Sequence, residues 1–170
     1  MKISFILILL ICPFFLIAQS NGNICSFGLN NGFETPFIEK QPIKMIDAGD
    51  VPNWLTTAPD NIIEICSTGT EGVTTYEGKQ FAELNANYKS TLIKNFICQA
   101  GVSQIINFAH RGRWGTDLMS VQIGPKSGPF ISLGIFSDGK VCRNYSRPFM
   151  PLLSGAYELQ FISVSSAGVR

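Results

Sequence analysis

Hydrophobic and polar residues alternate along much of the chain, with a period of two rather than the helical period. The stretches FAELNA, TLIKNFIC, DLMSVQI and YELQFISV place apolar residues at alternate positions. This alternation is typical of strands that have one face on a core and the other towards water. No stretch shows a convincing amphipathic helical pattern, so the sequence predicts an all-β fold.

Turn-forming residues divide these stretches into short strands. Gly, Pro, Asn and Asp cluster between them, for example at Asp60-Asn61 and Asp138-Gly139. The expected strands are Ile62–Cys66, Phe81–Ala86, Leu92–Cys98, Gln104–His110, Asp117–Ile123, Phe130–Phe136 and Tyr157–Ser165. Short strands with close turns predict an antiparallel two-sheet sandwich of the jelly-roll kind.

Three connections carry further expectations. The strands Gln104–His110 and Asp117–Ile123 flank RGRWGT, whose glycines permit a tight turn, so a hairpin is expected there. The stretch IGPKSGPF is expected to turn the chain again. Residues Glu39–Asp60 are interpreted as a long Pro-rich loop, with Trp54 as its apolar anchor.

The N-terminal stretch MKISFILILLICPFFLIAQS has the pattern of a secretory signal peptide. A single Lys2 precedes an apolar run from Ile3 to Ile17, which is shorter than the about 20 residues that a membrane-spanning helix needs. We therefore expect residues 1–20 to be cleaved and residues 21–170 to form a single exported β-sandwich domain, secreted or at the cell surface. No membrane span is expected in the mature chain.

The charge of the mature chain argues against nucleic acid as a partner. The full chain has 13 Lys and Arg and 12 Asp and Glu, so the loss of Lys2 leaves 12 of each. A formally neutral domain lacks the basic surface that phosphate backbones require.

Four cysteines remain after the signal peptide and its Cys12 are removed: Cys25, Cys66, Cys98 and Cys142. An even number in an exported protein suggests two disulfides, and we expect at least one. The three possible pairings stay open, and free buried thiols are the alternative. No CxxC spacing is present, which argues against a tetrahedral zinc site.

Several stretches, taken in their order and spacing, resemble a known kind of module. They are NNGFETP (30–36), VPNWLTTAPDNIIEI (51–65), YEGKQFAELNA (76–86), FAHRGRWGTDLMSVQIG (108–124) and SVSSAG (163–168). Together they resemble secreted bacterial β-sandwich modules of the galactose-binding-like fold, related to non-catalytic carbohydrate-binding modules. The resemblance implies a last strand after SVSSAG, which this sequence stops before, so the C-terminal strand is expected to be missing.

The same resemblance implies one structural calcium ion. In such modules the glutamate of the NGFE phrase joins backbone carbonyls in holding the ion, which carries over to Glu34 with carbonyls near Asn30 and Gly32. Oxygen ligands of this kind suit calcium. The alternative is that Glu34 is an ordinary carboxylate at the start of a strand.

The stretch FAHRGRWGTD holds the chain's one histidine and is the first candidate for ligand binding. Its polar side chains would hydrogen-bond a ligand while an aromatic ring stacks on it. The ligand-binding candidates are His110, Arg111, Arg113, Trp114 and, beyond this stretch, Trp54, which could form a stacking platform with Tyr76 and Tyr88.

The alternative for this stretch is structural. In it, Asp117 pairs with Arg111 or Arg113 across an exposed turn and His110 hydrogen-bonds at the edge of the core. For Trp54 the alternative is a ring that caps the core beneath the long loop.

No catalytic residue is expected. Glu64, Glu77 and Glu83 would suit a glycosidase only if two of them converge, and strand positions that face solvent explain Glu64 and Glu83 without chemistry. No GxSxG motif is present, and His110 has no evident nucleophile partner. The sequence favours a non-catalytic glycan-binding or adhesion module. The alternatives are a structural spacer domain of a bacterial surface protein and, third, a glycoside hydrolase.

Overall fold

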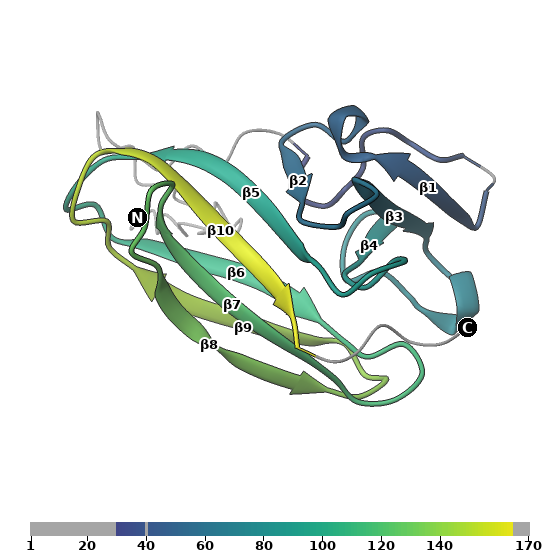
Figure 1. Ribbon diagram of the computed structural model, residues 1–170. Helices are drawn as coiled ribbons and strands as arrows, with labels where there is room; N and C mark the ends of the chain where they lie inside the picture. Colours follow the sequence, from purple (N-terminus) through teal and green to yellow (C-terminus); the bar gives the residue numbers. More distant parts are fainter. Residues whose placement is uncertain (1–29, 40, 165–170) are drawn as a thin grey trace, which may run out of the picture.

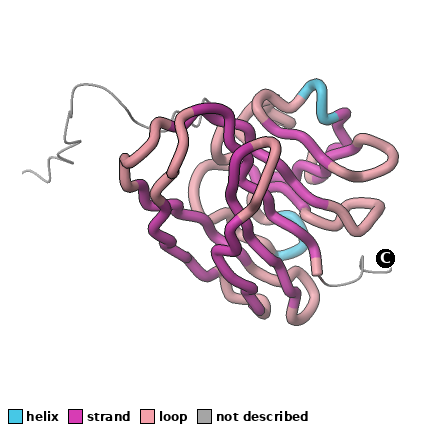
Figure 2. The backbone as a smooth tube through the Cα atoms, turned by 60° about the vertical axis from the view of Figure 1, so that its left-hand side comes forward, coloured by secondary structure: helices cyan, strands magenta, loops and turns pink. Residues whose placement is uncertain are grey.

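The computed structural model describes residues 30–39 and 41–164 (Figure 1). Strands dominate this part of the chain, and its helical residues lie in two short 3-10 turns, η1 (Ala48–Asp50) and η2 (Thr70–Gly72) (Figure 2). The strands are β1 (Ile43–Asp47), β2 (Trp54–Thr56), β3 (Ile62–Ser67), β4 (Gln80–Glu83), β5 (Thr91–Cys98), β6 (Gln104–His110), β7 (Asp117–Pro125), β8 (Ile131–Asp138), β9 (Arg143–Phe149) and β10 (Gly155–Ser163). All neighbouring strands pair antiparallel, which confirms the predicted all-β sandwich.

The strands form one large sheet and two smaller ones. The large sheet has the order β2-β5-β10-β7-β8, and the smaller sheets have the orders β1-β3-β4 and β6-β9. In Figure 1 the large sheet lies in front of β6 and β9, and β1, β3 and β4 lie beside its β2 end. Both small sheets therefore pack against the same face of the large sheet.

The core consists of two apolar clusters that meet between the sheets. One lies under β6 and β9 and includes Phe96, Val121 and Phe149, and the other lies under β1 and β3 and includes Trp54 and Ile65. Leu84 and Phe161 pack against both clusters, so the two halves share one continuous interior. The alternating pattern of β5 places every second residue in this interior, as the sequence predicts.

All seven expected strands are present, with ends shifted by up to three residues, but three strands escaped the sequence analysis. The interpretation of Glu39–Asp60 as a loop is wrong, because it contains β1 and β2. β9 was missed as well. β1 leaves Lys44 and Met45 exposed, and β9 carries Pro148 and alternates polar with half-buried residues. Such strands lack the apolar run or strict alternation that marks a strand in sequence.

The expected hairpin at RGRWGT is also wrong. β6 pairs with β9, whereas β7 pairs with β10 and β8, so this connection crosses from a small sheet to the large one. Gly112 lets two parts of this connection approach each other closely, since a Cβ at that position would collide with the carbonyl oxygen of Gly115. The second turn, IGPKSGPF, does join the paired strands β7 and β8, as expected.

The cysteines follow only part of the expectation. Cys66 and Cys142 carry free thiols, so two disulfides among the four mature cysteines are ruled out. Cys98 is disulfide-bonded, and Cys25 lies outside the described residues, so the pairing stays a prediction.

The ends of the chain also lie outside the described residues. This applies to the expected signal peptide, residues 1–20, and to residues 165–170, which bear on the expected loss of the last strand. Within the described residues, no helix is long and apolar enough to cross a membrane.

Lys94 is a buried cation in the core. It lies on the inward face of β5, only 3% exposed, with its Nζ 4.8 Å from the centre of the Trp54 ring. Burial lowers the pKa of Lys94 from 10.5 to about 8. The cation–π contact with Trp54 offsets part of the cost of burying the charge.

This burial predicts a pH dependence of stability. Between about pH 8 and pH 10.5 the unfolded chain binds a proton at Lys94 that the folded chain has lost, so the free energy of unfolding rises with pH. Relative to Lys94→Met, the wild type should gain roughly 2 to 3 kcal/mol between pH 7.5 and pH 10.5, measured by urea unfolding. Tyr145, whose pKa is raised, titrates in both proteins and cancels in this difference. A difference that stays constant with pH would contradict the account.

Candidate functional site

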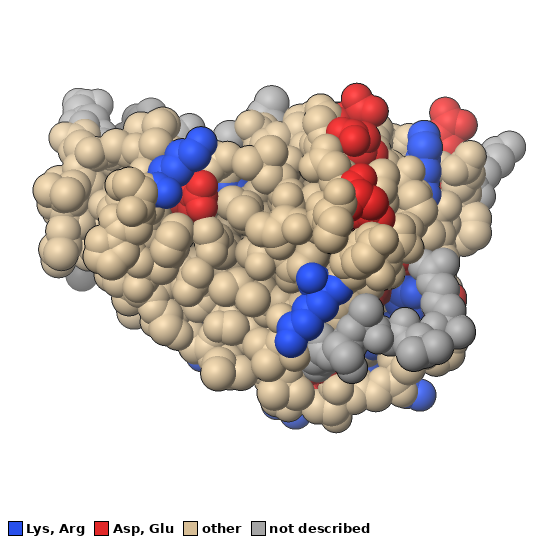
Figure 3. Space-filling model, viewed as in Figure 1, with Lys and Arg blue, Asp and Glu red and all other residues tan. Residues whose placement is uncertain are grey.

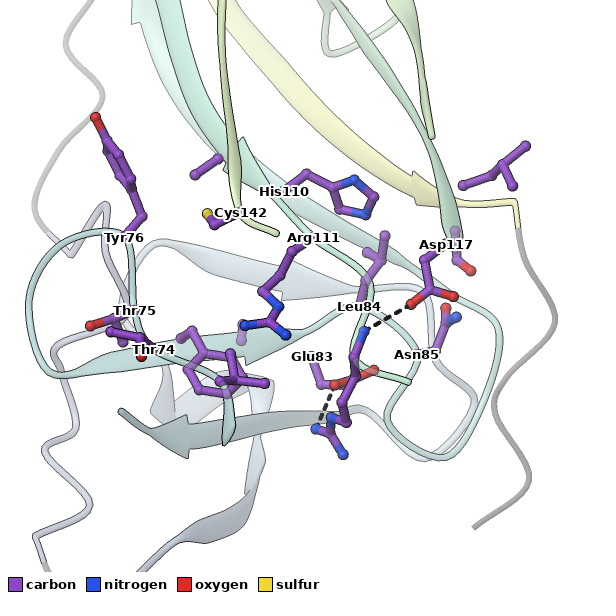
Figure 4. Close-up of a pocket in the computed structure, with 17 residues that line it drawn as sticks. Thr74, Thr75, Tyr76, Glu83, Leu84, Asn85, His110, Arg111, Asp117 and Cys142 are labelled. Atoms are coloured by element: carbon purple, nitrogen blue, oxygen red, sulfur yellow. Dashed lines mark hydrogen bonds and ion pairs between the residues drawn. The ribbon is translucent and has the colours of Figure 1, made fainter. Parts of the chain in front are cut away.

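A surface cleft of about 170 Å³ opens where β4, the loop before it and the β6–β7 connection meet (Figure 4). It lies at the end of β6 that carries His110 and at the start of β7. Residues from five parts of the chain line it, among them Thr74, Thr75 and Tyr76 from the loop before β4, Glu83, Leu84 and Asn85 from β4 and its end, His110, Arg111, Arg113 and Asp117 from the end of β6 to the start of β7, Cys142 before β9, and Ser163 at the end of β10.

Arg113 forms the floor of this region through a buried ion cluster. Its Nη2 lies 3.0 Å from Oε1 of Glu64 and also binds Glu83, and its Nη1 lies 3.1 Å from Oε2 of Glu71. The Glu64 side chain is fully buried and that of Arg113 is 10% exposed. The β6–β7 connection is thereby fixed to β3, to β4 and to the η2 turn.

The cluster offsets the repulsion between two carboxylates on neighbouring strands. Glu64 and Glu83 stand directly opposite each other in the β3–β4 pair, where like charges repel. A guanidinium between them turns this repulsion into two attractive contacts. Burial lowers the pKa of Arg113, but the charge of Glu83 and the hydrogen bond to Glu64 outweigh it, and the pKa ends above its ordinary value.

The expected ion pair of Asp117 with Arg111 or Arg113 is wrong. Asp117 Oδ2 accepts a hydrogen bond from the backbone N–H of Arg113 at 3.4 Å, while the Arg113 guanidinium is directed to the glutamates. Arg111 donates from Nε to the carbonyl of Gly112 at 3.2 Å. Its guanidinium lies among the cleft residues in Figure 4, so Arg111 rather than Arg113 is the arginine placed to meet a ligand.

His110 belongs to a second polar cluster at the edge of the core. Its Nδ1 lies 2.8 Å from Oδ2 of the fully buried Asp138, which also accepts a hydrogen bond from Tyr145 Oη at 2.7 Å and lies 3.5 Å from Nε of Arg143. The hydrogen bond to Asp138 raises the pKa of Tyr145. His110 is thus held as the structural alternative expected, by a hydrogen bond where β6 ends.

Cys142 does not form a nucleophile with this histidine. Figure 4 shows the imidazole of His110 pointing away from the Cys142 thiol. Burial raises the pKa of Cys142, although Arg111 opposes the shift, so the thiol stays protonated at neutral pH. Burial, together with the charge of Glu64, also raises the pKa of Cys66 to about 12. Neither thiol has the thiolate character that reactive cysteines require.

The aromatic candidates differ in burial and in their distance from the cleft. Trp54 is 5% exposed, stacks on Phe33 with ring centroids 4.2 Å apart and donates its indole N–H to the carbonyl of Asn30 at 2.7 Å. Its ring is therefore a core cap and is not available to a ligand, so the platform with Tyr76 and Tyr88 is wrong. Tyr76 is 60% exposed and lines the cleft, whereas the exposed rings of Tyr88 and Trp114 are not among its lining residues.

Glu34 has a role that its contacts explain without a metal. Its Oε1 accepts the backbone N–H groups of Lys79 and Gln80 at 2.8 and 3.0 Å, at the start of β4. Asn30, the other main candidate, has its carbonyl bound to the Trp54 indole. Among the described residues, no group of three or more His, Cys, Asp or Glu side chains is arranged to hold a metal. The calcium ion stays an untested prediction.

The comparisons with known proteins give a fold and no family. No family model matches the sequence, and no curated protein matches it. Among solved structures, the chain is similar to the carbohydrate-binding module TmCBM61, determined in complex with β-1,4-galactotriose, with a TM-score of 0.57 and 14% identity over 84% of this chain and 89% of that chain. This similarity supports the β-sandwich fold. A CBM4 structure aligns at a TM-score of 0.45 and 10% identity, over 82% of this chain and 90% of that chain.

The sequence did not predict two of the contacts at this site, those of Glu71 with Arg113 and of Asp138 with His110. Glu71 lies in a turn and Asp138 was identified only as part of a turn signal, and nothing in the sequence joins them to Arg113 or His110. The interpretation of Glu64 as a solvent-facing strand position is wrong, because its side chain is fully buried. The sequence did contain a signal, since a carboxylate inside the apolar stretch IIEIC needs a buried partner. Arg113 is the partner that the sandwich supplies.

The buried cluster predicts a large cost for removing the arginine. Arg113→Met leaves Glu64 buried without its cation, so the free energy of unfolding should fall by about 3 to 5 kcal/mol in urea denaturation. Arg143→Met is the matched control, because the Arg143 side chain is 69% exposed and its ion pair with Asp138 is 3.5 Å long. The control should lose less than about 1 kcal/mol. Equal losses in the two variants would refute the special role of Arg113.

Proposed function

We propose that this chain is an exported, non-catalytic carbohydrate-binding module whose ligand occupies the cleft at the end of β6. The similar fold of TmCBM61, whose structure holds β-1,4-galactotriose, supports the class of function. The signal-peptide pattern of residues 1–20 supports export, to the medium or the cell surface. Adhesion to a glycan-bearing surface is the biological setting that this proposal implies.

The observation that carries the proposal is the chemistry of the cleft. A sugar presents a flat C–H face and a rim of hydroxyl groups, and the cleft offers an aromatic face and polar groups together. Tyr76 is exposed at its rim, and Thr74, Thr75 and Arg111 lie beside it (Figure 4).

The placement of the carboxylates supports a non-catalytic role. A glycosidase needs one carboxyl group to protonate the leaving oxygen and a second to act as nucleophile or base. Glu64 and Glu83 do converge, but on the same Nη2 of Arg113, and Glu64 is fully buried. Both carboxylates are thereby committed to an ion cluster and do not form the acid and base pair of a hydrolase.

The proposal predicts that removing the Tyr76 ring weakens glycan binding. A glycan array that includes β-1,4-galactotriose identifies the ligand, and calorimetry then compares variants. Tyr76→Ala should weaken binding about tenfold, the equivalent of about 1.4 kcal/mol. Tyr88→Ala is the control, because Tyr88 is also exposed, at 47%, and is not among the residues that line the cleft.

Two results would count against the proposal. Silence of the folded wild type across the array favours the alternative of a structural spacer domain. Binding that survives Tyr76→Ala and fails in Tyr88→Ala would move the ligand away from the cleft. Trp54 and Arg113 are unsuitable for this test, since both are buried structural residues.

A further inference from the structure

The two ends of the sandwich differ in chemistry. The cleft lies at one end of β6 and β7, and three loops meet at the opposite end: residues 99–103, 126–130 and 150–154. The strand registers place them together, because Gly155 pairs with Cys98, Gln104 with Phe149 and Tyr157 with Pro125. We call these three loops the apolar tip. They contain one charged residue, Lys126, and no carboxylate.

Large apolar side chains are exposed at this tip. Met150, Leu152 and Leu153 are 53%, 76% and 67% exposed, three of four consecutive residues. Ile97, at the end of β5, is 60% exposed beside them. In Figure 1 the loops after β5 and after β9 turn side by side at the far end of the molecule. The described atoms at this end are mostly tan in Figure 3, with one blue and one red group set back from the loops.

The exposed leucines are held outward by a fixed backbone. The carbonyl of Pro151, a buried residue, accepts the N–H of Gly101 at 2.8 Å. The carbonyl of Leu153 accepts the hydroxyl of the buried Tyr157 at 2.8 Å. A loop anchored in this way cannot fold its leucines into the core. Clustered apolar side chains kept in water in this manner mark a docking surface.

We propose that the apolar tip docks on a lipid membrane surface, independently of the glycan cleft. The leucines stand on a protruding loop rather than in a groove, a shape that can insert between headgroups. The tip has no carboxylate that an anionic bilayer would repel, and Lys126 attracts one.

Vesicle flotation tests this inference on the full chain, expressed with its own N-terminus and purified after export. The vesicles contain phosphatidylcholine and phosphatidylglycerol at a ratio of four to one. The double variant Leu152→Ser/Leu153→Ser should lower the fraction that floats at least tenfold. Ile135→Ser is the matched control, because Ile135 is as exposed as Leu153, at 67%, but lies on β8 away from the tip.

The proposal holds if the wild type and Ile135→Ser float alike and the double variant does not. It fails if the wild type stays with the soluble fraction, if all three proteins float alike, or if the control loses binding as the double variant does. Size-exclusion chromatography on the same samples covers self-association, and a wild-type dimer that the double variant abolishes without any vesicle binding also overturns it. Glycan binding should be the same in all three proteins, so failure here leaves the cleft proposal intact.

Discussion

The contact between Arg113 and Glu64 is the constraint on which the functional end of the molecule depends. It is an interaction between a loop and a strand from different sheets, formed where water is excluded. A fully buried carboxylate is tolerable only when a cation and hydrogen bonds accompany it. Because that cation comes from the β6–β7 connection, the contact holds this connection against β3 and β4 beside the cleft.

The same contact decides which chemistry the cleft can offer. It directs Arg113, Glu64 and Glu83 towards one another, and leaves Arg111, Thr74 and Tyr76 among the cleft residues that are free to meet a ligand. These remaining groups are a planar donor, a hydroxyl group and an aromatic ring, which suit ligand recognition. The buried ion cluster and the non-catalytic proposal are therefore two consequences of one arrangement.

Local patterns predicted the strands well and their partners poorly. Alternation in TLIKNFIC and DLMSVQI reports which face of a strand is buried, and the structure confirms those strands as β5 and β7. Alternation says nothing about which strand lies alongside, so RGRWGT was interpreted as a hairpin although it crosses between sheets. β1 and β9 were missed because strands with solvent-facing polar residues carry little hydrophobic signal.

The site was predictable in its residues more than in its contacts. FAHRGRWGTD does supply His110, Arg111 and Arg113 to the cleft region. Their partners Glu64, Glu71 and Asp138 lie 28 to 49 residues away in the sequence, on other elements of the sandwich. Trp54 shows the same limit, since an aromatic residue in a Pro-rich segment has the same sequence signal whether its ring faces the core or a ligand. Only the sandwich resolves these cases.

Hydrogen exchange on Arg113→Met tests the central claim most directly, because it reports where the structure loosens. The account predicts that amides of residues 111–117 and of the cleft rim, residues 70–85, lose more protection than the global destabilisation removes from β5 and β10 in the large sheet. A loss of protection around the cleft that is no larger than the loss in β5 and β10 would contradict the claim that this arginine organises the site.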